Sequence, residues 1–102
     1  MSWIDAGPPQ DLHDGQAKSL AMGRRMVAVV RSGGTFYAIE DICTHDGAPL
    51  TGGEIEGNEI ICPRHGARFC LRTGEALTPP AYEPVRVFET KIENGRLWVR
   101  AD

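Results

Sequence analysis

The sequence predicts an all-β fold, with an antiparallel β-sandwich base and a small subdomain inserted between its strands. Apolar residues do not recur with helical spacing over any sustained stretch. Instead, short runs rich in valine, isoleucine and aromatic residues are separated by turns that contain glycine. Between residues 41 and 80 glycine and proline become dense and the apolar runs shorten, which marks the insertion.

Five of these runs form the predicted base. We expect strands at residues 16–21, 25–31, 35–40, 85–92 and 97–100. Gly23 falls in the turn between the first two strands, and Gly33-Gly34 falls in a tight hairpin between the second and the third. Asn94-Gly95 is the clearest turn signal, because both residues tolerate the positive φ angles of a type I′ hairpin.

The predicted insertion carries three shorter strands. They lie at residues 53–56, 59–61 and 67–71, with turns at residues 57–58 and 73–74. No repeat, linker or low-complexity tract divides the 102 residues, and a chain of this length supports one modest core. We therefore expect a single domain over residues 1–102, with the insertion spanning about residues 41–80.

Composition and charge argue against several classes of function. The hydrophobic fraction of 41% and the charged fraction of 25% are ordinary for a soluble globular protein. No apolar run approaches the roughly 20 residues of a transmembrane helix. Residues 1–5 also lack the basic and apolar segments of a secretory signal. A net charge of −3 without a basic tract argues against nucleic-acid binding.

Two short segments, Cys43-Thr44-His45 and Cys62-Pro63-Arg64-His65, carry the chemistry of this chain. They hold two of its three cysteines and two of its three histidines, so each offers one thiolate and one imidazole. One interpretation is purely structural, with buried cysteines and solvated histidines. A second is a tetrahedral zinc site with two sulfur and two nitrogen ligands. A third is a two-iron, two-sulfide cluster, with thiolates on one iron and imidazoles on the other.

The order of the four residues favours the iron–sulfur cluster. Zinc fingers usually place two cysteines together and two histidines later on a helix. Here each loop offers one cysteine and one histidine, so that each loop can span both irons. Gly47 and Gly66 follow the histidines closely, at positions where the backbone would crowd a cofactor and leave no room for a Cβ.

Cys70 is the third cysteine and has no obvious partner. An odd number of cysteines argues against a disulfide framework, and a reducing cytoplasm is the simplest compartment. We interpret Cys70 as a small buried hydrophobe. Strand alternation, however, places it on the same face as Arg68 and Arg72, where two cations would lower the pKa of the thiol and make it reactive.

The two segments together resemble the signature of Rieske iron–sulfur proteins. The similarity runs through Cys43–Leu50, Cys62–Phe69 and Arg72–Glu75, and it extends to the hairpin at Gly33–Ile39. These runs and the short chain are similar to the Rieske-type ferredoxins of bacterial oxygenase systems. The resemblance covers nearly the whole chain, and it implies the Rieske fold for it.

The resemblance also implies the cofactor and its ligands. It implies one Rieske-type [2Fe-2S] cluster, with Cys43 and Cys62 on one iron and His45 and His65 on the other. High-potential respiratory Rieske proteins carry additional cysteines and hydroxyl donors near the cluster, and the matching positions here offer neither. Because fewer donors stabilise the reduced cluster, we expect a reduction potential near the low end of the Rieske range, roughly −150 mV.

The function that follows from the resemblance is electron transfer without catalysis. Such a ferredoxin carries one electron from a flavin-dependent ferredoxin reductase to a terminal oxygenase that hydroxylates aromatic rings. The chain has no dinucleotide-binding fingerprint, and we expect a monomer with no nucleic-acid or membrane partner. Two alternatives stay open, namely the small Rieske-like subunit of an assimilatory nitrite reductase and a zinc-stabilised interaction module.

Overall fold

The computed structural model describes residues 2–101, and its antiparallel sheets confirm the predicted all-β class. The strands are β1 (Trp3–Asp5), β2 (Gln16–Met22), β3 (Arg25–Ser32), β4 (Thr35–Glu40), β5 (Ile55–Glu56), β6 (Glu59–Ile61), β7 (Arg68–Cys70), β8 (Val87–Phe88), β9 (Thr90–Glu93) and β10 (Arg96–Arg100). One turn of 3₁₀ helix, η1 (Pro9–Asp11), is the only helical element in the described range. The three sheets have the orders β1-β10-β9, β2-β3-β4-β8 and β5-β6-β7.

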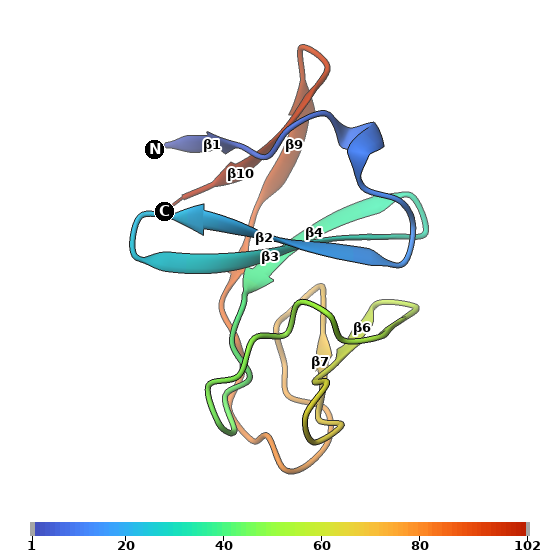
Figure 1. Ribbon diagram of the computed structural model, residues 1–102, viewed down its shortest axis with the longest axis vertical. Coiled ribbons are helices and arrows are strands. Elements are labelled where there is room, and N and C mark those ends of the chain that lie inside the picture. Colours follow the sequence, from blue (N-terminus) through green and yellow to red (C-terminus); the bar gives the residue numbers. More distant parts are fainter. Residues whose placement is uncertain (1, 102) are drawn as a thin grey trace.

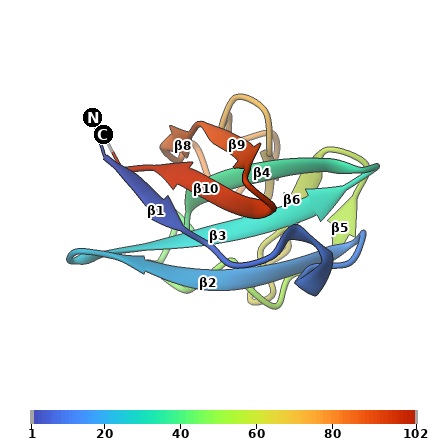
Figure 2. The ribbon, with the colours of Figure 1, turned by 90° about the horizontal axis from the view of Figure 1, so that it is seen from above.

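The first two sheets form the base, and strand β3 lies at its centre (Figures 1 and 2). Val27 and Val29 belong to the core between the two sheets, whereas Ala28 and Val30 belong to a second core. All four side chains are fully buried. Because both faces of β3 are covered, its sequence is continuously apolar instead of alternating between apolar and polar residues.

The second core joins the base to the segment inserted between β4 and β8. Figure 1 shows this segment, with β6 and β7, below the sheet that contains β2, β3 and β4. The buried members of the second core are Ala28, Val30, Ile39, Cys43, Leu50, Ile60, Cys62, Ala67, Phe69, Leu71, Ala81 and Val85. Two cysteines of the predicted ligand pairs are therefore part of the apolar interior.

The hairpin predictions are confirmed by the backbone angles. Asn94 and Gly95 have φ angles of 55° and 74° between β9 and β10, as a type I′ turn requires. Gly33 and Gly34 have φ angles of 59° and 79° between β3 and β4. Local turn chemistry was therefore sufficient to locate both reversals of the chain.

The predicted strand at residues 85–92 is wrong as a single element. The chain forms two short strands there, and β8 pairs with β4 whereas β9 pairs with β10. Phe88 is buried in the core of the base, and Glu89 lies at the junction of the two strands. The chain thus crosses from one sheet to the other while staying extended, so residue alternation alone does not reveal the break.

Other boundaries differ because the partners are distant in sequence. Strand β1, which was not predicted, pairs antiparallel with β10 at the other end of the chain. In the insertion, β5 begins only at Ile55 and β7 covers only Arg68–Cys70. Gly53 precedes β5 and passes so close to the neighbouring backbone that a Cβ there would lie 1.9 Å from the Ile61 carbonyl oxygen.

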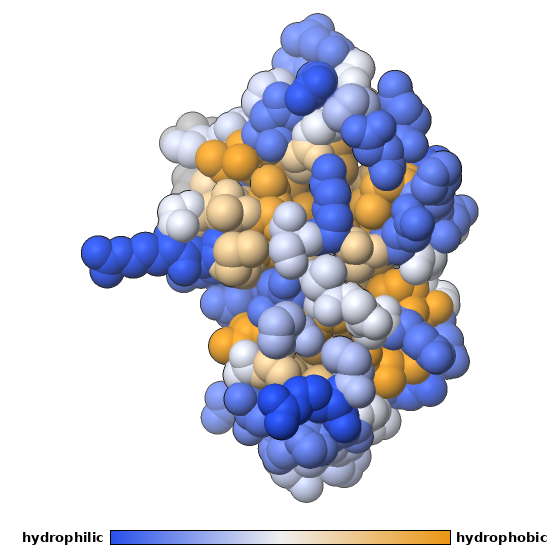
Figure 3. All heavy atoms as spheres, in the orientation of Figure 1, coloured by the Kyte–Doolittle hydropathy of each residue, from blue (hydrophilic) through white to orange (hydrophobic). Residues whose placement is uncertain are grey.

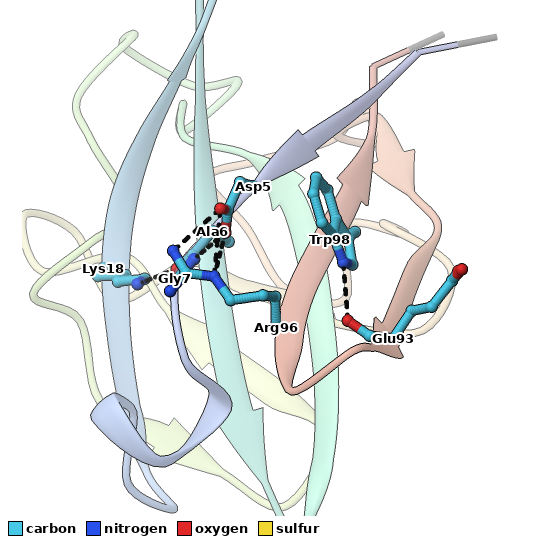
Figure 4. Close-up of polar contacts among 7 residues, drawn as sticks. All are labelled: Asp5, Ala6, Gly7, Lys18, Glu93, Arg96 and Trp98. Carbon is cyan, nitrogen blue, oxygen red and sulfur yellow. Dashed lines mark hydrogen bonds and ion pairs between the residues drawn. The ribbon is translucent and has the colours of Figure 1, made fainter.

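Polar contacts fix the edge of the base next to β1 (Figure 4). The Asp5 carboxylate accepts the Gly7 N–H at 2.8 Å and pairs with the Arg96 guanidinium at 2.9 Å. The Arg96 hydrogen bond, followed by that of Gly7, lowers the pKa of Asp5 below its ordinary value. The Lys18 ammonium contacts the Ala6 carbonyl nearby.

Apolar and hydrophilic side chains are unevenly distributed over the surface. In Figure 3, apolar side chains gather around the middle of the visible face, and the two ends are mostly hydrophilic. Among the described residues, no helix has the length and apolar character that crossing a membrane requires.

Candidate metal centre

Two loops with the same local geometry carry the two ligand pairs. In the first loop the Cys43 N–H donates to the Ala48 carbonyl at 2.7 Å, and the Gly47 N–H donates to the Cys43 carbonyl at 2.7 Å. The second loop repeats both bonds over residues 62–67, at 2.7 and 3.0 Å. The two similar runs of sequence therefore fold into two equivalent tight turns, each of which directs its cysteine inward.

The glycines of these turns have a local conformational role. Gly47 and Gly66 have φ angles of 80° and 76°, in the left-handed region that side chains with a Cβ rarely adopt. A Cβ added to either glycine would have no protein atom within 4 Å. The positive φ angle is by itself sufficient reason for glycine at both positions, and the predicted crowding by a cofactor stays a prediction.

The two cysteines of the pairs lie together in the interior. Cys43 and Cys62 are 0% and 1% exposed, and both belong to the second core. Burial raises the pKa of the Cys43 thiol and the adjacent Cys62 adds to this effect, whereas the backbone N–H groups of His45 and Asp46 lower it in part. Since a thiolate is the form that binds metal, these sulfurs are suited to a site where a cation offsets the cost of burial.

The two histidines lie together on the outside of the same loops. His45 and His65 are exposed, their ring centroids are 4.9 Å apart, and the rings are perpendicular, with an interplanar angle of 89°. One nitrogen of each imidazole and one Asp46 oxygen lie within 4.8 Å of one another. The structure thus brings the four predicted residues into two pairs, with sulfur inside and nitrogen at the surface.

Asp46 is a residue of this site that sequence reasoning missed. Its Oδ1 atom accepts the Ala48 N–H at 3.0 Å, and its Oδ2 atom lies 3.4 Å from Arg64 Nε and 3.3 Å from His65 Nε2. The Ala48 hydrogen bond is the largest cause that lowers the pKa of Asp46, and the charge of Arg64 adds to it. The signal available in the sequence was an acidic side chain directly after a predicted ligand, His45.

Asp41 is a second residue that was missed, and it anchors the first loop to the base. Its Oδ1 atom accepts the N–H groups of Leu50 and Thr51, each at 2.8 Å. Its Oδ2 atom accepts the hydroxyl groups of Ser19 and Thr51, also at 2.8 Å. Only 9% of the residue is exposed, so the carboxylate links the far end of the loop to β2 within the protein interior.

Cys70 differs from the interpretation as a buried hydrophobe. It is partly exposed, whereas its neighbour Phe69 is fully buried, as the alternation along β7 requires. Burial raises the pKa of the Cys70 thiol, but hydrogen bonds from Thr73 and the charge of Arg72 outweigh this, and the pKa is lowered. Cys70 is not among the groups of potential metal ligands found in the described chain.

The donor set fits a cluster with two chemically different poles. Two buried sulfurs that lie within 4.8 Å of each other can reach one iron, and two imidazoles at the surface can reach a second. The backbone N–H groups of His45 and Asp46 lower the pKa of the Cys43 thiol, so they favour the thiolate form that binds a metal. The residues present therefore suit the mixed sulfur and nitrogen ligation that the sequence predicted.

Comparisons with known proteins agree with this donor set. The model of the Rieske [2Fe-2S] domain family matches residues 2–89. The chain is 34% identical over 102 residues to the ferredoxin component of the naphthalene 1,2-dioxygenase/salicylate 5-hydroxylase systems of Ralstonia sp. That alignment covers 100% of this chain and 98% of the relative.

Solved structures share the fold over nearly the whole chain. The ferredoxin of carbazole 1,9a-dioxygenase from Nocardioides aromaticivorans IC177 matches with a TM-score of 0.94 and 29% identity, over 100% of both chains. A chain from a complex of reduced oxygenase and oxidized ferredoxin in carbazole 1,9a-dioxygenase matches with a TM-score of 0.92 and 35% identity. The second match covers 98% of this chain and 94% of that chain.

Proposed function

The chain belongs to the Rieske [2Fe-2S] domain family, and we propose on that basis that it is the ferredoxin of a multicomponent ring-hydroxylating oxygenase system. Its relatives are ferredoxin components, so it is an electron-transfer component and not an enzyme. The observation that carries the proposal is the pairing of two buried thiols with two exposed imidazoles on two equivalent loops.

Within this proposal, Cys43 and Cys62 hold one iron, and His45 and His65 hold the other. The two sulfurs lie within 4.8 Å of each other and the two ring centroids are 4.9 Å apart, and both distances support the assignment. When bound, a cluster with this ligation accepts and releases one electron, at a potential above that of an all-cysteine cluster. The buried cysteines keep water from the inner pole, and the exposed histidines offer the outer pole to a partner.

The proposed partners are a flavin-dependent ferredoxin reductase and a terminal oxygenase. The matched chain from the carbazole 1,9a-dioxygenase complex supports an oxygenase as the electron acceptor. The side chain of His65 is 43% exposed, which lets a partner approach the nitrogen pole directly. We further propose that the chain acts as a cytoplasmic monomer and as a single domain, with residues 41–80 as the part that binds the cluster.

Electron paramagnetic resonance tests the cofactor and its ligands. We expect the dithionite-reduced protein to give a one-electron Rieske signal, with a midpoint potential near the low end of the range, roughly −150 mV. The His45→Ala and His65→Ala variants should lose this signal because one iron loses a ligand. His13→Ala is the matched control, since His13 is exposed and lies outside both loops, and it should keep the signal.

Several results would contradict the proposal. If the protein is colourless and binds zinc but no iron, the chain is a zinc-stabilised interaction module and holds no iron–sulfur cluster. If the protein purifies from the source cell in a stoichiometric complex with a large nitrite reductase subunit, it is the small subunit of that enzyme and not a separate electron carrier. A midpoint above about +100 mV would leave the ligand assignment intact but overturn the low-potential prediction.

A further inference from the structure

Asp46 occupies a special position between the two ligand loops. It directly follows His45 in the first loop, and its carboxylate reaches across to His65 Nε2 in the second at 3.3 Å. The Ala48 N–H at 3.0 Å and the Arg64 guanidinium at 3.4 Å hold the carboxylate there. The residue as a whole is exposed, but its side chain, which carries the charge, is only 20% exposed, so water screens this charge incompletely.

We propose that Asp46 is a positioning residue for the cluster, which orients the His65 imidazole and lowers the reduction potential. This inference rests on the assignment of His65 as an iron ligand in the proposed function. The Asp46 carboxylate lies 3.3 Å from His65 Nε2, so it contacts the imidazole of a proposed ligand directly. Such a contact restricts the orientations that the ring of a ligand histidine can take.

The charge of Asp46 acts on the two redox states differently. The oxidised cluster is one unit more positive than the reduced cluster, so a nearby negative charge stabilises the oxidised state more. Arg64 has the opposite sign and partly neutralises Asp46 from the solvent side, where its own side chain is 64% exposed. Removal of Asp46 should therefore favour reduction, and removal of Arg64 should oppose it.

The test compares Asp46→Asn with a matched variant of the base, Asp5→Asn. Asp5 has the same kind of surroundings as Asp46, with an N–H donor two residues later and an arginine partner (Figure 4). It lies on β1 in the base, away from β6 and β7 (Figure 1). Both substitutions remove one negative charge and keep an oxygen that can accept the local N–H.

We expect Asp46→Asn to raise the equilibrium constant for reduction about tenfold, which is 59 mV for one electron. Asp5→Asn should leave the reduction potential unchanged. Asp46→Glu keeps the negative charge and should give the potential of the unaltered protein, whereas Arg64→Gln should lower the potential. Pulsed electron paramagnetic resonance should also show that Asp46→Asn changes the nitrogen coupling of one histidine ligand. That second measurement separates positioning from a loss of charge alone.

Two results would overturn the inference. The first is a shift in Asp46→Asn no larger than that in Asp5→Asn, with unchanged nitrogen couplings. The second is an equal shift in Asp46→Asn and Asp46→Glu, which would indicate disturbed packing instead of a lost charge. If the unaltered protein itself gives no Rieske signal, the ligand assignment has failed and this inference fails with it.

Discussion

At the scale of single residues, the site separates its donors by exposure. The same short loop carries a buried sulfur and an exposed imidazole two or three residues apart, so neighbouring positions have opposite environments. This is possible because each loop is a tight turn closed by two backbone hydrogen bonds. A turn of this kind directs the cysteine toward the second core and leaves the histidine on the outer surface.

Cys70 allows a test of reactivity against pH. Hydrogen bonds from Thr73 and the charge of Arg72 more than offset the effect of burial, so the pKa of the Cys70 thiol lies below its ordinary value of 9.0. A lowered pKa means that the reactive thiolate forms at lower pH than in the unfolded chain. We expect iodoacetamide to label Cys70 in the cluster-loaded protein, with a rate that rises through a midpoint below 9.0.

The control for this labelling is built into the chain. Cys43 and Cys62 are buried, so mass spectrometry should find them unlabelled until the cluster is removed. Cys70→Ser should abolish the early label. An absence of label on Cys70 below pH 9.0 would contradict the lowered pKa and would favour the interpretation as an inert residue.

At the scale of elements, a loop is held to the base by one carboxylate. Asp41 lies directly after β4 and bonds to β2 through Ser19 and to the far end of the first loop through Leu50 and Thr51. Four donors converge on it in a position that is 9% exposed. The loop that carries Cys43 and His45 is therefore fixed at both ends before any metal binds.

Removal of this carboxylate should destabilise the whole protein. Asp41→Ala leaves two backbone N–H groups without their buried acceptor, and unsatisfied buried donors cost on the order of 1–3 kcal/mol each. We expect the free energy of unfolding in urea to fall by about 3 kcal/mol. Denaturation followed by circular dichroism measures the change.

Asp14→Ala is the matched control for this experiment. Asp14 pairs with Arg31 at 3.3 Å and accepts the Gly34 N–H at 3.1 Å, but its side chain is 59% exposed, so water can replace it as an acceptor, and surface ion pairs contribute about 0–1 kcal/mol. Its removal should therefore change the unfolding midpoint little. If both variants unfold at the same urea concentration, Asp41 does not anchor the loop in the way described here.

At the scale of the whole molecule, two cores divide the sources of stability. The core of the base lies between β-sheets that contain no predicted ligand, whereas the second core includes Cys43 and Cys62. Metal binding to folded but not to unfolded ligands adds its free energy to folding. The cluster should therefore stabilise the inserted segment far more than it stabilises the base.

Removal of the cluster should expose this division. After chelation of iron under reducing conditions, we expect amide hydrogen exchange to accelerate in residues 43–71 while β2, β3 and β4 keep most of their protection. The reason is that the base retains its own core when the ligand loops lose their shared centre. Uniform acceleration across the chain would contradict this and would indicate a single cooperative unit.

Much of this architecture follows from short-range signals. The Asn94-Gly95 turn, the glycines of the β3–β4 hairpin and the apolar run in β3 each depend on a few neighbouring residues, and the structure agrees with all three. Contacts between segments that are distant in sequence were not predictable in the same way. The pairing of β1 with β10 and the break between β8 and β9 depend on which sheet each segment joins.

The candidate site has the same division between local and distant causes. The sequence by itself determined the donor types and their spacing, because two runs of similar composition fold into two equivalent turns. Only the tertiary structure decided that Asp46 faces His65 and that Asp41 joins the first loop to the base. A carboxylate finds its partners through space, and the residues that surround it come from separate loops and strands whose approach no local pattern specifies.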